Sequence, residues 1–440
     1  MSAKLKFICL LLLAVLALSG CMLTVDEMYY LPKRSEDYNN LQSAIEKAMP
    51  GLEYSAPLSG ENQQTVQTAD LNGDGIMEYL LFAKGSQERP LRILIFRQLN
   101  DTYMHVQTIE GNGSGFDSVE YVNMDDRKGM ELVVGSQLAD QLMRSVSVYS
   151  FGENMEANLL VSANYLKFLT VDLDEDSVSE LFVLHPGQTE TDNGLAELYG
   201  FENGTMERSN EVKMSQPADQ LKRIIAGKLH DGEPAVYVAS TVGETALITD
   251  VYAYLDGRLS NVSLSNESGT SVQTMRNYYV YADDIDSDGV VELPSLITML
   301  PLPDSSTSER HDLIRWYAMT VSGSEVDKKF TYHNFMGGWY MELDSQWASR
   351  LTVLRLGSQY EFYIWDEALL NSEKVLTIHI NMDQSRMEQN QTEDSLILMK
   401  HDNVMYMASL EPSAEKYGIT QESVMASFHL IRQDWKTGET

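Results

Sequence analysis

The sequence predicts a mainly β protein: a β-propeller of about five four-stranded blades, followed by a small C-terminal α+β domain. A loop motif recurs with a period near fifty residues, and about four short strand-like runs separate one copy from the next. This combination is typical of propellers and other repeat arrays. Between about residues 62 and 330 no helix-length apolar periodicity is found, which argues against a βαβ architecture. We therefore expect the propeller at 62–335 and the α+β domain at 336–440.

The recurring motif is clearest in ADLNGDGIMEYLLF, residues 69–82. Oxygen-bearing side chains occupy alternate positions, and Gly75, Glu78 and an apolar run follow. The spacing resembles the front of an EF-hand loop, but the last acidic residue comes at position 9 instead of 12, and a strand pattern follows it. Full copies recur in VDLDEDSVSELFVL (171–184) and DDIDSDGVVELPSL (283–296).

Two further copies are degenerate. In the copy that begins at 123, Arg127 replaces the third oxygen donor, and the copy that begins at 227 keeps only Asp231 and Gly232. Counted from the first position, the five copies begin at 70, 123, 172, 227 and 284, at intervals of 49 to 57 residues. This regular spacing makes each copy a candidate turn of one blade.

The three full copies predict calcium loops. Several carboxylates within nine residues repel one another unless a cation neutralises them, and hard oxygen ligands suit calcium. The side chains at positions 1, 3, 5 and 9 and the carbonyl at position 7 would be ligands, with water completing the shell. A solvated, Asx-rich turn is the alternative, and Arg127 can itself neutralise its copy. The predicted ligands of about three structural sites are Asp70, Asn72, Asp74, Ile76, Glu78, Asp172, Asp174, Asp176, Val178, Glu180, Asp284, Asp286, Asp288, Val290 and Glu292.

These repeats resemble the FG-GAP or VCBS-type repeats of integrin α-subunit propellers and of many bacterial surface proteins. In that family a D-x-[DN]-x-D-G-x-x-[DE] loop between two strands of a blade holds calcium. The resemblance covers residues 62–335, about sixty percent of the chain. The Phe-Gly and Gly-Ala-Pro elements that name the family are not evident in this sequence. The resemblance implies a propeller fold with structural calcium.

The N-terminus predicts a lipoprotein signal peptide at residues 1–20. Lys4 and Lys6 precede an apolar stretch from Phe7 to Leu18, which is too short for a permanent membrane span. LSGC, residues 18–21, resembles the bacterial lipobox, which implies that Cys21 is acylated and anchors an extracytoplasmic protein to the cell membrane. An ordinary signal peptide with an incidental cysteine is the alternative. Cys9 is the only other cysteine, so no intramolecular disulfide is expected.

The charge balance excludes one class of partner. The chain has 32 basic and 65 acidic residues, a net charge of -33. Such a charge repels phosphate backbones and attracts cations. We therefore expect no nucleic-acid partner.

The segments on either side of the propeller carry other patterns. Residues 21–61 read as a lipidated tether and a short helix (35–49) that packs on the first blade. Beyond 336, five strands and a closing helix (420–435) are expected, and GWYMELDSQW (338–347) loosely resembles PsbP-like sandwiches. An aromatic cluster in this domain is either core or a ligand face: Trp339, Tyr340, Trp347, Tyr360, Phe362, Tyr363 and Trp365.

No residue is assigned to catalysis or to a cofactor other than calcium. The eight histidines are dispersed, and GNGSGFD (111–117) reads as an inter-blade loop. Ser413 and Lys416 form an S-x-x-K without companion motifs. The sequence therefore favours a non-enzymatic binding or scaffolding protein for an envelope protein, peptide or glycan. The alternative is a surface enzyme that degrades polysaccharide or peptide at the propeller opening, using a carboxylate pair.

Overall fold

The computed structural model describes residues 36–100, 102–138, 144–189, 192–277, 280–302, 311–366, 370–381, 395–432 and 435. The predicted signal peptide, the lipobox and Cys21 lie outside the described residues. Within those residues, no helix is both long enough and apolar enough to cross a membrane.

Six antiparallel sheets follow one another along the described chain. The first contains β1 (Glu53–Tyr54), β2 (Val66–Ala69), β3 (Glu78–Lys84), β4 (Leu91–Leu99) and β5 (Thr102–Gly111). The second contains β6 (Gly115–Val122), β7 (Glu131–Gln137), β8 (Arg144–Phe151) and β9 (Ala157–Tyr165). The third contains β10 (Lys167–Val171), β11 (Glu180–His185), β12 (Leu195–Glu202) and β13 (Thr205–Lys213).

The fourth sheet contains β14 (Leu221–Lys228), β15 (Pro234–Val242), β16 (Ala246–Leu255) and β17 (Arg258–Asn261). The fifth contains β18 (Glu292–Thr298), β19 (Asp312–Met319), β20 (Glu325–Asn334), β21 (Trp339–Leu343) and β27 (Phe428–Leu430). The sixth contains β22 (Leu351–Leu356), β23 (Gln359–Asp366), β24 (Asn371–Asn381), β25 (Leu396–His401) and β26 (Val404–Leu410). The helices are α2 (Glu36–Ala48), η2 (Ala218–Gln220), η3 (Val272–Thr274), η4 (Pro412–Tyr417) and α4 (Gln421–Ser427).

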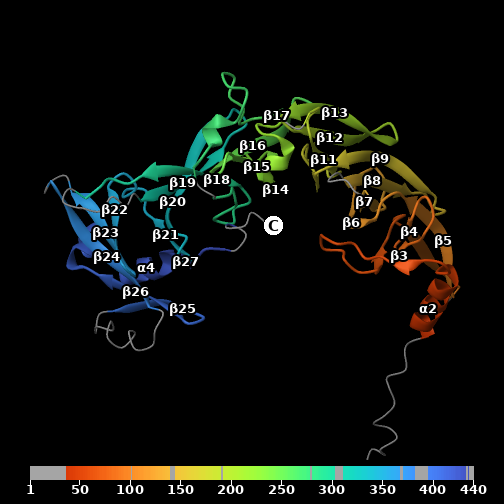
Figure 1. Ribbon diagram of the computed structural model, residues 1–440, viewed down its shortest axis with the longest axis horizontal. Coiled ribbons are helices and arrows are strands. Elements are labelled where there is room, and N and C mark those ends of the chain that lie inside the picture. Colours follow the sequence, from red (N-terminus) through yellow and green to blue (C-terminus); the bar gives the residue numbers. More distant parts are fainter. Residues whose placement is uncertain are drawn as a thin grey trace, which may run out of the picture.

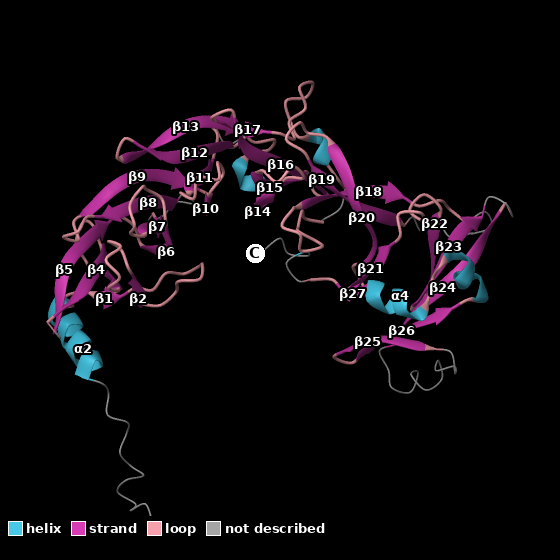
Figure 2. Cartoon of the chain, turned by 180° about the vertical axis from the view of Figure 1, so that it is seen from behind, coloured by secondary structure: helices cyan, strands magenta, loops and turns pink. Residues whose placement is uncertain are grey.

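The sheets have the arrangement of propeller blades. In Figures 1 and 2 they follow one another along an arc, with β6, β10 and β14 toward its centre and β5, β9, β13 and β17 on its outside. The predicted fold class, a mainly β propeller of four-stranded blades, is confirmed. In both views the arc stays open between the first and the last sheet.

Each pair of successive sheets shares an apolar core. Phe82 of the first sheet packs with Phe116 of the second, with ring centroids 5.1 Å apart. Phe182 of the third sheet packs in the same way with Tyr252 of the fourth, at 5.5 Å. Further clusters join the second sheet to the third, the fourth to the fifth and the fifth to the sixth. Because inner strands are buried on both faces, they appear in the sequence as continuous apolar runs.

Helix α2 covers the face of the first sheet that a closed ring would present to its last blade. Ile45 is buried in a cluster with Leu81, Leu94 and Phe96, and Leu41 packs against the same cluster. The predicted packing of this helix on the first blade is confirmed. Repeat arrays need such a cover on a terminal unit, since its outer apolar face has no neighbouring repeat.

The C-terminal region differs from the sequence prediction in two ways. The expected closing helix ends at Ser427, and the next three residues form β27, which pairs with β21 through Met341 and Phe428. The helical periodicity was therefore misleading, because β21 offers these residues a ladder of backbone hydrogen bonds. The expected first strand of this region is two strands, β21 and β22, and β21 belongs to the fifth sheet.

Trp435 ties the C-terminal segment to the fifth sheet. It is buried, its ring stacks on His333 with centroids 5.8 Å apart, and its indole N–H donates to Asp283 Oδ2. Arg432 Nη1 lies 3.5 Å from the same carboxylate oxygen. Arg432 and Trp435 thus lie beside Asp283, the residue before the last acidic motif.

Replacement of Thr420 by alanine should destabilise the C-terminal region slightly. Thr420 caps α4, because its side chain accepts from the backbone N–H of Ser423 while the Ser423 hydroxyl accepts from the backbone N–H of Thr420. Loss of such a cap costs about 1 kcal/mol. Denaturant unfolding of Thr420→Ala and of the conservative Thr420→Ser should show this loss only for alanine, and equal midpoints would refute the role of the cap.

Candidate metal sites

The five motif copies occupy equivalent places in five successive sheets. We name them loop 1 (70–78), loop 2 (123–131), loop 3 (172–180), loop 4 (227–235) and loop 5 (284–292). With β2, β6, β10 and β14 counted as the first strands of the four-stranded blades, loops 1 to 4 connect the first strand of a blade to its second. In loop 5 the first strand is reduced to a bridge between Asp283 and Glu292. The period read from the sequence therefore matches the blade repeat.

A buried glutamate forms the base of four of these loops. It is the ninth residue of the motif and the first residue of the second strand. Its Oε2 accepts a hydrogen bond from the backbone N–H of the second motif residue in every case. The pairs are Leu71–Glu78 at 3.0 Å, Met124–Glu131 at 2.6 Å, Leu173–Glu180 at 2.8 Å and Ile285–Glu292 at 3.1 Å. This bond leaves Oε1 of each glutamate available to the loop.

The three full copies also share an unusual backbone. Their fourth and sixth residues have positive φ, which folds the loop back on itself and costs little only at glycine. Loop 3 adopts this backbone without glycine, at Glu175 and Ser177. The φ values are 72° and 83° for Gly73 and Gly75, 60° and 72° for Glu175 and Ser177, and 61° and 85° for Ser287 and Gly289. Loop 3 therefore has the same backbone shape as the other two loops, although neither of these positions is glycine in its sequence.

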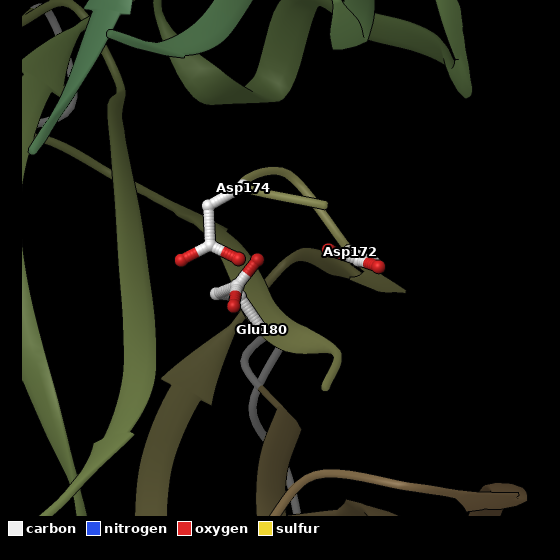
Figure 3. Close-up of side chains that lie close together, drawn as sticks. All are labelled: Asp172, Asp174 and Glu180. Carbon is white, nitrogen blue, oxygen red and sulfur yellow. The ribbon is translucent and has the colours of Figure 1, made fainter. Parts of the chain in front are cut away.

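Carboxylates converge in loops 3 and 5. In loop 3, oxygens of Asp172, Asp174 and Glu180 lie within 4.8 Å of one another, and Figure 3 shows the three carboxyl groups gathered around the turn. Asp284, Asp286 and Glu292 form the same group in loop 5. These are motif positions 1, 3 and 9, which the sequence predicted as ligands.

The fifth motif position lies outside both groups. The carboxyl of Asp176 accepts from the backbone N–H of Val178 at 2.7 Å. Asp288 makes the same bond to Val290, and its other oxygen lies 2.7 Å from Lys328 Nζ. The seventh residues, Ile76, Val178 and Val290, all donate their N–H to the fifth-position side chain. The structure thus orients the fifth carboxyl toward the backbone.

The glutamates of these two loops are electrostatically unfavourable as isolated charges. Burial raises the pKa of Glu180 to about 7; the Leu173 N–H opposes this shift, and the carboxylates of loop 3 add to it. Burial likewise raises the pKa of Glu292 to about 7, with Asp286 and Asp288 adding to the shift. A nearby cation favours the charged form of a carboxyl group. Loops 3 and 5 are therefore chemically suited to a divalent cation with oxygen ligands.

Loop 1 contains a counter-ion supplied by the chain itself. A guanidinium nitrogen of Arg97, from β4, pairs with Asp74, and Arg97 Nε lies 3.5 Å from Glu78 Oε1. Asp70 accepts from the backbone N–H groups of Gly73 and Gly75 at 2.9 and 2.8 Å. Nothing in the loop motif itself indicates this arginine, which lies 19 residues after Glu78.

The two degenerate loops have lost the carboxylate group. In loop 2, Arg127 Nε lies 2.9 Å from Asp125 Oδ2, the neutralisation that the sequence suggested. In loop 4, Asp231 accepts from the backbone N–H of Val321 at 2.9 Å, and Leu229 and Glu233 close a tight turn. Neither loop has the donor set of loops 3 and 5.

Backbone hydrogen bonds link neighbouring loops, a feature that the sequence did not reveal. The N–H of Met130 in loop 2 donates to the carbonyl of Asp70 in loop 1 at 3.2 Å. Ser179 of loop 3 donates in the same way to Asn123 of loop 2 at 2.8 Å. Between loops 4 and 5 the equivalent donor, Val291, bonds to Lys228 at 3.0 Å. A change in the conformation of one loop would therefore affect the loop of the neighbouring blade.

The remaining sequence candidates are mostly engaged elsewhere. The Ser413 hydroxyl donates to the carbonyl of Lys374, while Lys416 Nζ contacts Asp366 and Glu373, so these two side chains do not bond to each other. Of the aromatic cluster, three members are core residues with at most 5% exposure: Trp339, Tyr360 and Phe362.

A cavity of about 440 Å³ lies where β21, the sixth sheet and α4 meet. Its apolar lining includes Phe362 and Val424, and the half-buried rings of Trp347 and Tyr417 also border it. Asp344 is an exposed acidic residue of its lining. The volume falls within the range of small-ligand pockets, about 300 to 1,000 Å³.

Comparison with known proteins adds only broad similarities. No family model matches the chain, and no match is found among the curated proteins. Sqt1 from Saccharomyces cerevisiae is similar in structure over 82% of this chain and 100% of its own, at 10% identity and a TM-score of 0.30. The β-propeller domain of the Trilobed protease from Pyrococcus furiosus covers 72% of this chain and 91% of its own, at 12% identity and a TM-score of 0.28.

An exotype rhamnogalacturonan lyase, YesX, is similar over 89% of this chain and 83% of its own, at 11% identity and a TM-score of 0.26. The solved structures that resemble the chain thus include the propeller domain of a protease and a polysaccharide lyase. At such scores the similarities support no inference about activity, ligand or partner. The PsbP-like resemblance of the C-terminal region gains no support from these comparisons.

Proposed function

We propose that this chain is a membrane-anchored, extracytoplasmic lipoprotein that binds or scaffolds an envelope protein, peptide or glycan, with an FG-GAP or VCBS-type propeller stabilised by calcium. The observation that carries the proposal is the pair of equivalent carboxylate groups in loops 3 and 5, each closed by a buried glutamate. Calcium at these positions would hold the first two strands of a blade together. It would act on structure and take no part in a reaction.

The residues present fit calcium in loops 3 and 5. Three carboxyl groups within 4.8 Å offer several hard oxygens to one cation. Oε1 of Glu292 is buried without a hydrogen-bond partner among the described residues, so an oxygen is already desolvated for a ligand. Extracellular modules bind calcium with dissociation constants of about 10⁻⁴ to 10⁻³ M, which suits an extracytoplasmic location.

The cavity beside α4 is our candidate for the ligand site. Aromatic rings over an apolar floor with an acidic residue on the lining suit a peptide side chain or a sugar face. A pull-down from intact envelope with wild type and Trp347→Ala, in calcium and in chelator, tests the proposal. Partners retained by the wild type only with calcium support it, and Phe335→Ala, at the residue after β20, is a control outside this lining. Turnover of cell-wall or plant glycans by the purified protein would favour the enzymatic alternative.

Replacement of Cys21 by serine should release the protein from the membrane. An acyl chain contributes about 0.8 kcal/mol per buried methylene, so loss of the modified thiol removes the anchor. Cell fractionation of wild type and Cys21→Ser, with Cys9→Ser as the matched control, measures the effect. Retention of Cys21→Ser in the membrane fraction would contradict the lipid anchor without bearing on the calcium loops.

A further inference from the structure

The structure distinguishes the acidic loops by a residue that lies outside the motif. We propose that Arg97, which faces the ninth-position glutamate of loop 1 from the third strand of its blade, excludes calcium from that loop, and that the small residues at the equivalent positions of loops 3 and 5 permit it. The inference rests on the proposed calcium binding and names which of the three predicted loops carry it.

Strand register identifies the equivalent facing positions. β3 pairs with β4 so that Tyr79 faces Phe96, which sets Glu78 opposite Arg97. In the fifth sheet β18 pairs with β19, and Glu292 is itself a paired residue, opposite Ala318. The same reasoning sets Glu131 opposite Ser150, because Leu132 pairs with Tyr149, and Glu180 opposite Gly200, because Leu181 pairs with Tyr199. The facing residues are therefore Arg97, Ser150, Gly200 and Ala318 in loops 1, 2, 3 and 5.

Arg97 brings a positive charge to the base of loop 1. Its guanidinium contacts Asp74 and Glu78, two of the predicted ligands, and its side chain is only 17% exposed. Guanidinium stays charged at any ordinary pH, and its planar donors match carboxylate oxygens. Arg97 therefore neutralises loop 1 from within, and a calcium ion at the same oxygens would meet a like charge.

Loop 2 is also neutralised by an arginine, but this arginine comes from the loop itself and not from the facing position. Ser150 accepts a hydrogen bond from Arg127 Nη2 at 3.2 Å, while Arg127 Nε pairs with Asp125. The facing serine thus helps to hold a guanidinium that comes from the loop itself. In both loop 1 and loop 2, an arginine guanidinium thus pairs with a carboxylate of the loop.

Gly200 and Ala318 leave the carboxylates of loops 3 and 5 together. A Cβ added at Gly200 would lie 3.8 Å from Glu180 Cγ, so a side chain there would point at the base of loop 3 without a clash. Among the described residues, groups of three or more His, Cys, Asp or Glu side chains that could hold a metal occur in these two loops. In loop 1 the third motif position is Asn72, which would offer a neutral amide oxygen instead of a carboxylate. In loop 5 Glu292 is fully buried, and its Oε1 has no hydrogen-bond partner among the described residues. Glu78 Oε1 of loop 1 is buried in the same way, but there Arg97 Nε lies 3.5 Å away.

The number of calcium ions bound per chain tests the inference. We would strip the purified protein with chelator and measure calcium binding by equilibrium dialysis and by titration calorimetry. Wild type should bind two ions. Arg97→Ala should bind three, because loop 1 loses its internal cation, and Gly200→Arg should bind one, because loop 3 gains the arginine that loop 1 has.

Three controls separate charge from general damage. Gly200→Ala adds a Cβ without a charge and should still bind two ions. Arg208→Ala removes an arginine from β13 that pairs with Glu197, away from the loops, and should also bind two. Circular dichroism of every variant checks that the fold is kept.

Each result is decisive. Three ions on the wild type, or two on both folded Arg97→Ala and folded Gly200→Arg, would overturn the role of the facing residue while leaving calcium binding intact. A wild type that binds no calcium would overturn the metal proposal and this inference with it. Should Gly200→Arg fail to fold, the number of ions bound by Arg97→Ala alone decides.

Discussion

Removal of calcium is expected to lower the melting temperature of the purified protein by several degrees. When free calcium is ten times its dissociation constant, each site stabilises the folded state by about 1.4 kcal/mol. Two sites, in loops 3 and 5, would contribute about 3 kcal/mol, a substantial part of an ordinary folding free energy. Thermal unfolding followed by circular dichroism, in millimolar calcium and in chelator, measures the difference.

The double variant Asp174→Ala with Asp286→Ala should no longer respond to calcium. Both residues belong to the carboxylate groups and both are exposed, so their loss removes ligands without opening the core. Asp126→Ala, an exposed aspartate of the degenerate loop 2, is the matched control and should keep the wild-type response. An identical melt of the wild type with and without calcium would contradict a structural role for the metal.

Acidification from pH 7.5 to 4.5 should destabilise the wild type more than His333→Phe. Burial lowers the pKa of His333 to about 3, and neither ring nitrogen has a hydrogen-bond partner among the described residues. The ring lies between aromatic side chains, stacked on Trp435 and 5.1 Å from Tyr340 between centroids. Protonation would place an unpaired charge in this apolar site.

The sign follows from proton linkage. Between pH 6.5, the ordinary value, and about 3, the unfolded chain binds one proton more than the folded chain at this histidine, so stability falls as pH falls. The slope is about 1.4 kcal/mol per pH unit, which gives about 2.7 kcal/mol at pH 4.5. Denaturant midpoints of wild type and His333→Phe at the two pH values test this. Parallel losses in both proteins would show that His333 does not contribute.

The connection between loops gives the metal sites a role beyond a single blade. Met130 and Ser179 bond to the preceding loop through the backbone, and Lys228 Nζ lies 3.3 Å from Glu175 of loop 3 while its backbone bonds to loop 5. In repeat proteins, stability is the sum of repeat terms and interface terms between neighbours. A cation that orders loop 3 therefore stabilises both blades that adjoin it.

Much of the fold was readable from the sequence because its determinants are local. Inner strands such as β3 and β4 appear as apolar runs, and positions 1, 3 and 9 of the acidic motif recur with the blade period. The same locality explains one of the errors: helical periodicity around Phe428 was outweighed by pairing with β21, a strand far away in the sequence.

The sequence by itself determined the blade repeat, the place of each acidic turn and the helix that covers the first sheet, since each depends on residues within one repeat. Only the tertiary structure decided which turn receives a counter-ion from outside its motif. Arg97 pairs with Asp74 and lies beside Glu78 of loop 1, whereas strand register sets Gly200 opposite Glu180 of loop 3. Strand register is set by the packing of whole sheets, and no spacing within a nine-residue motif can specify it.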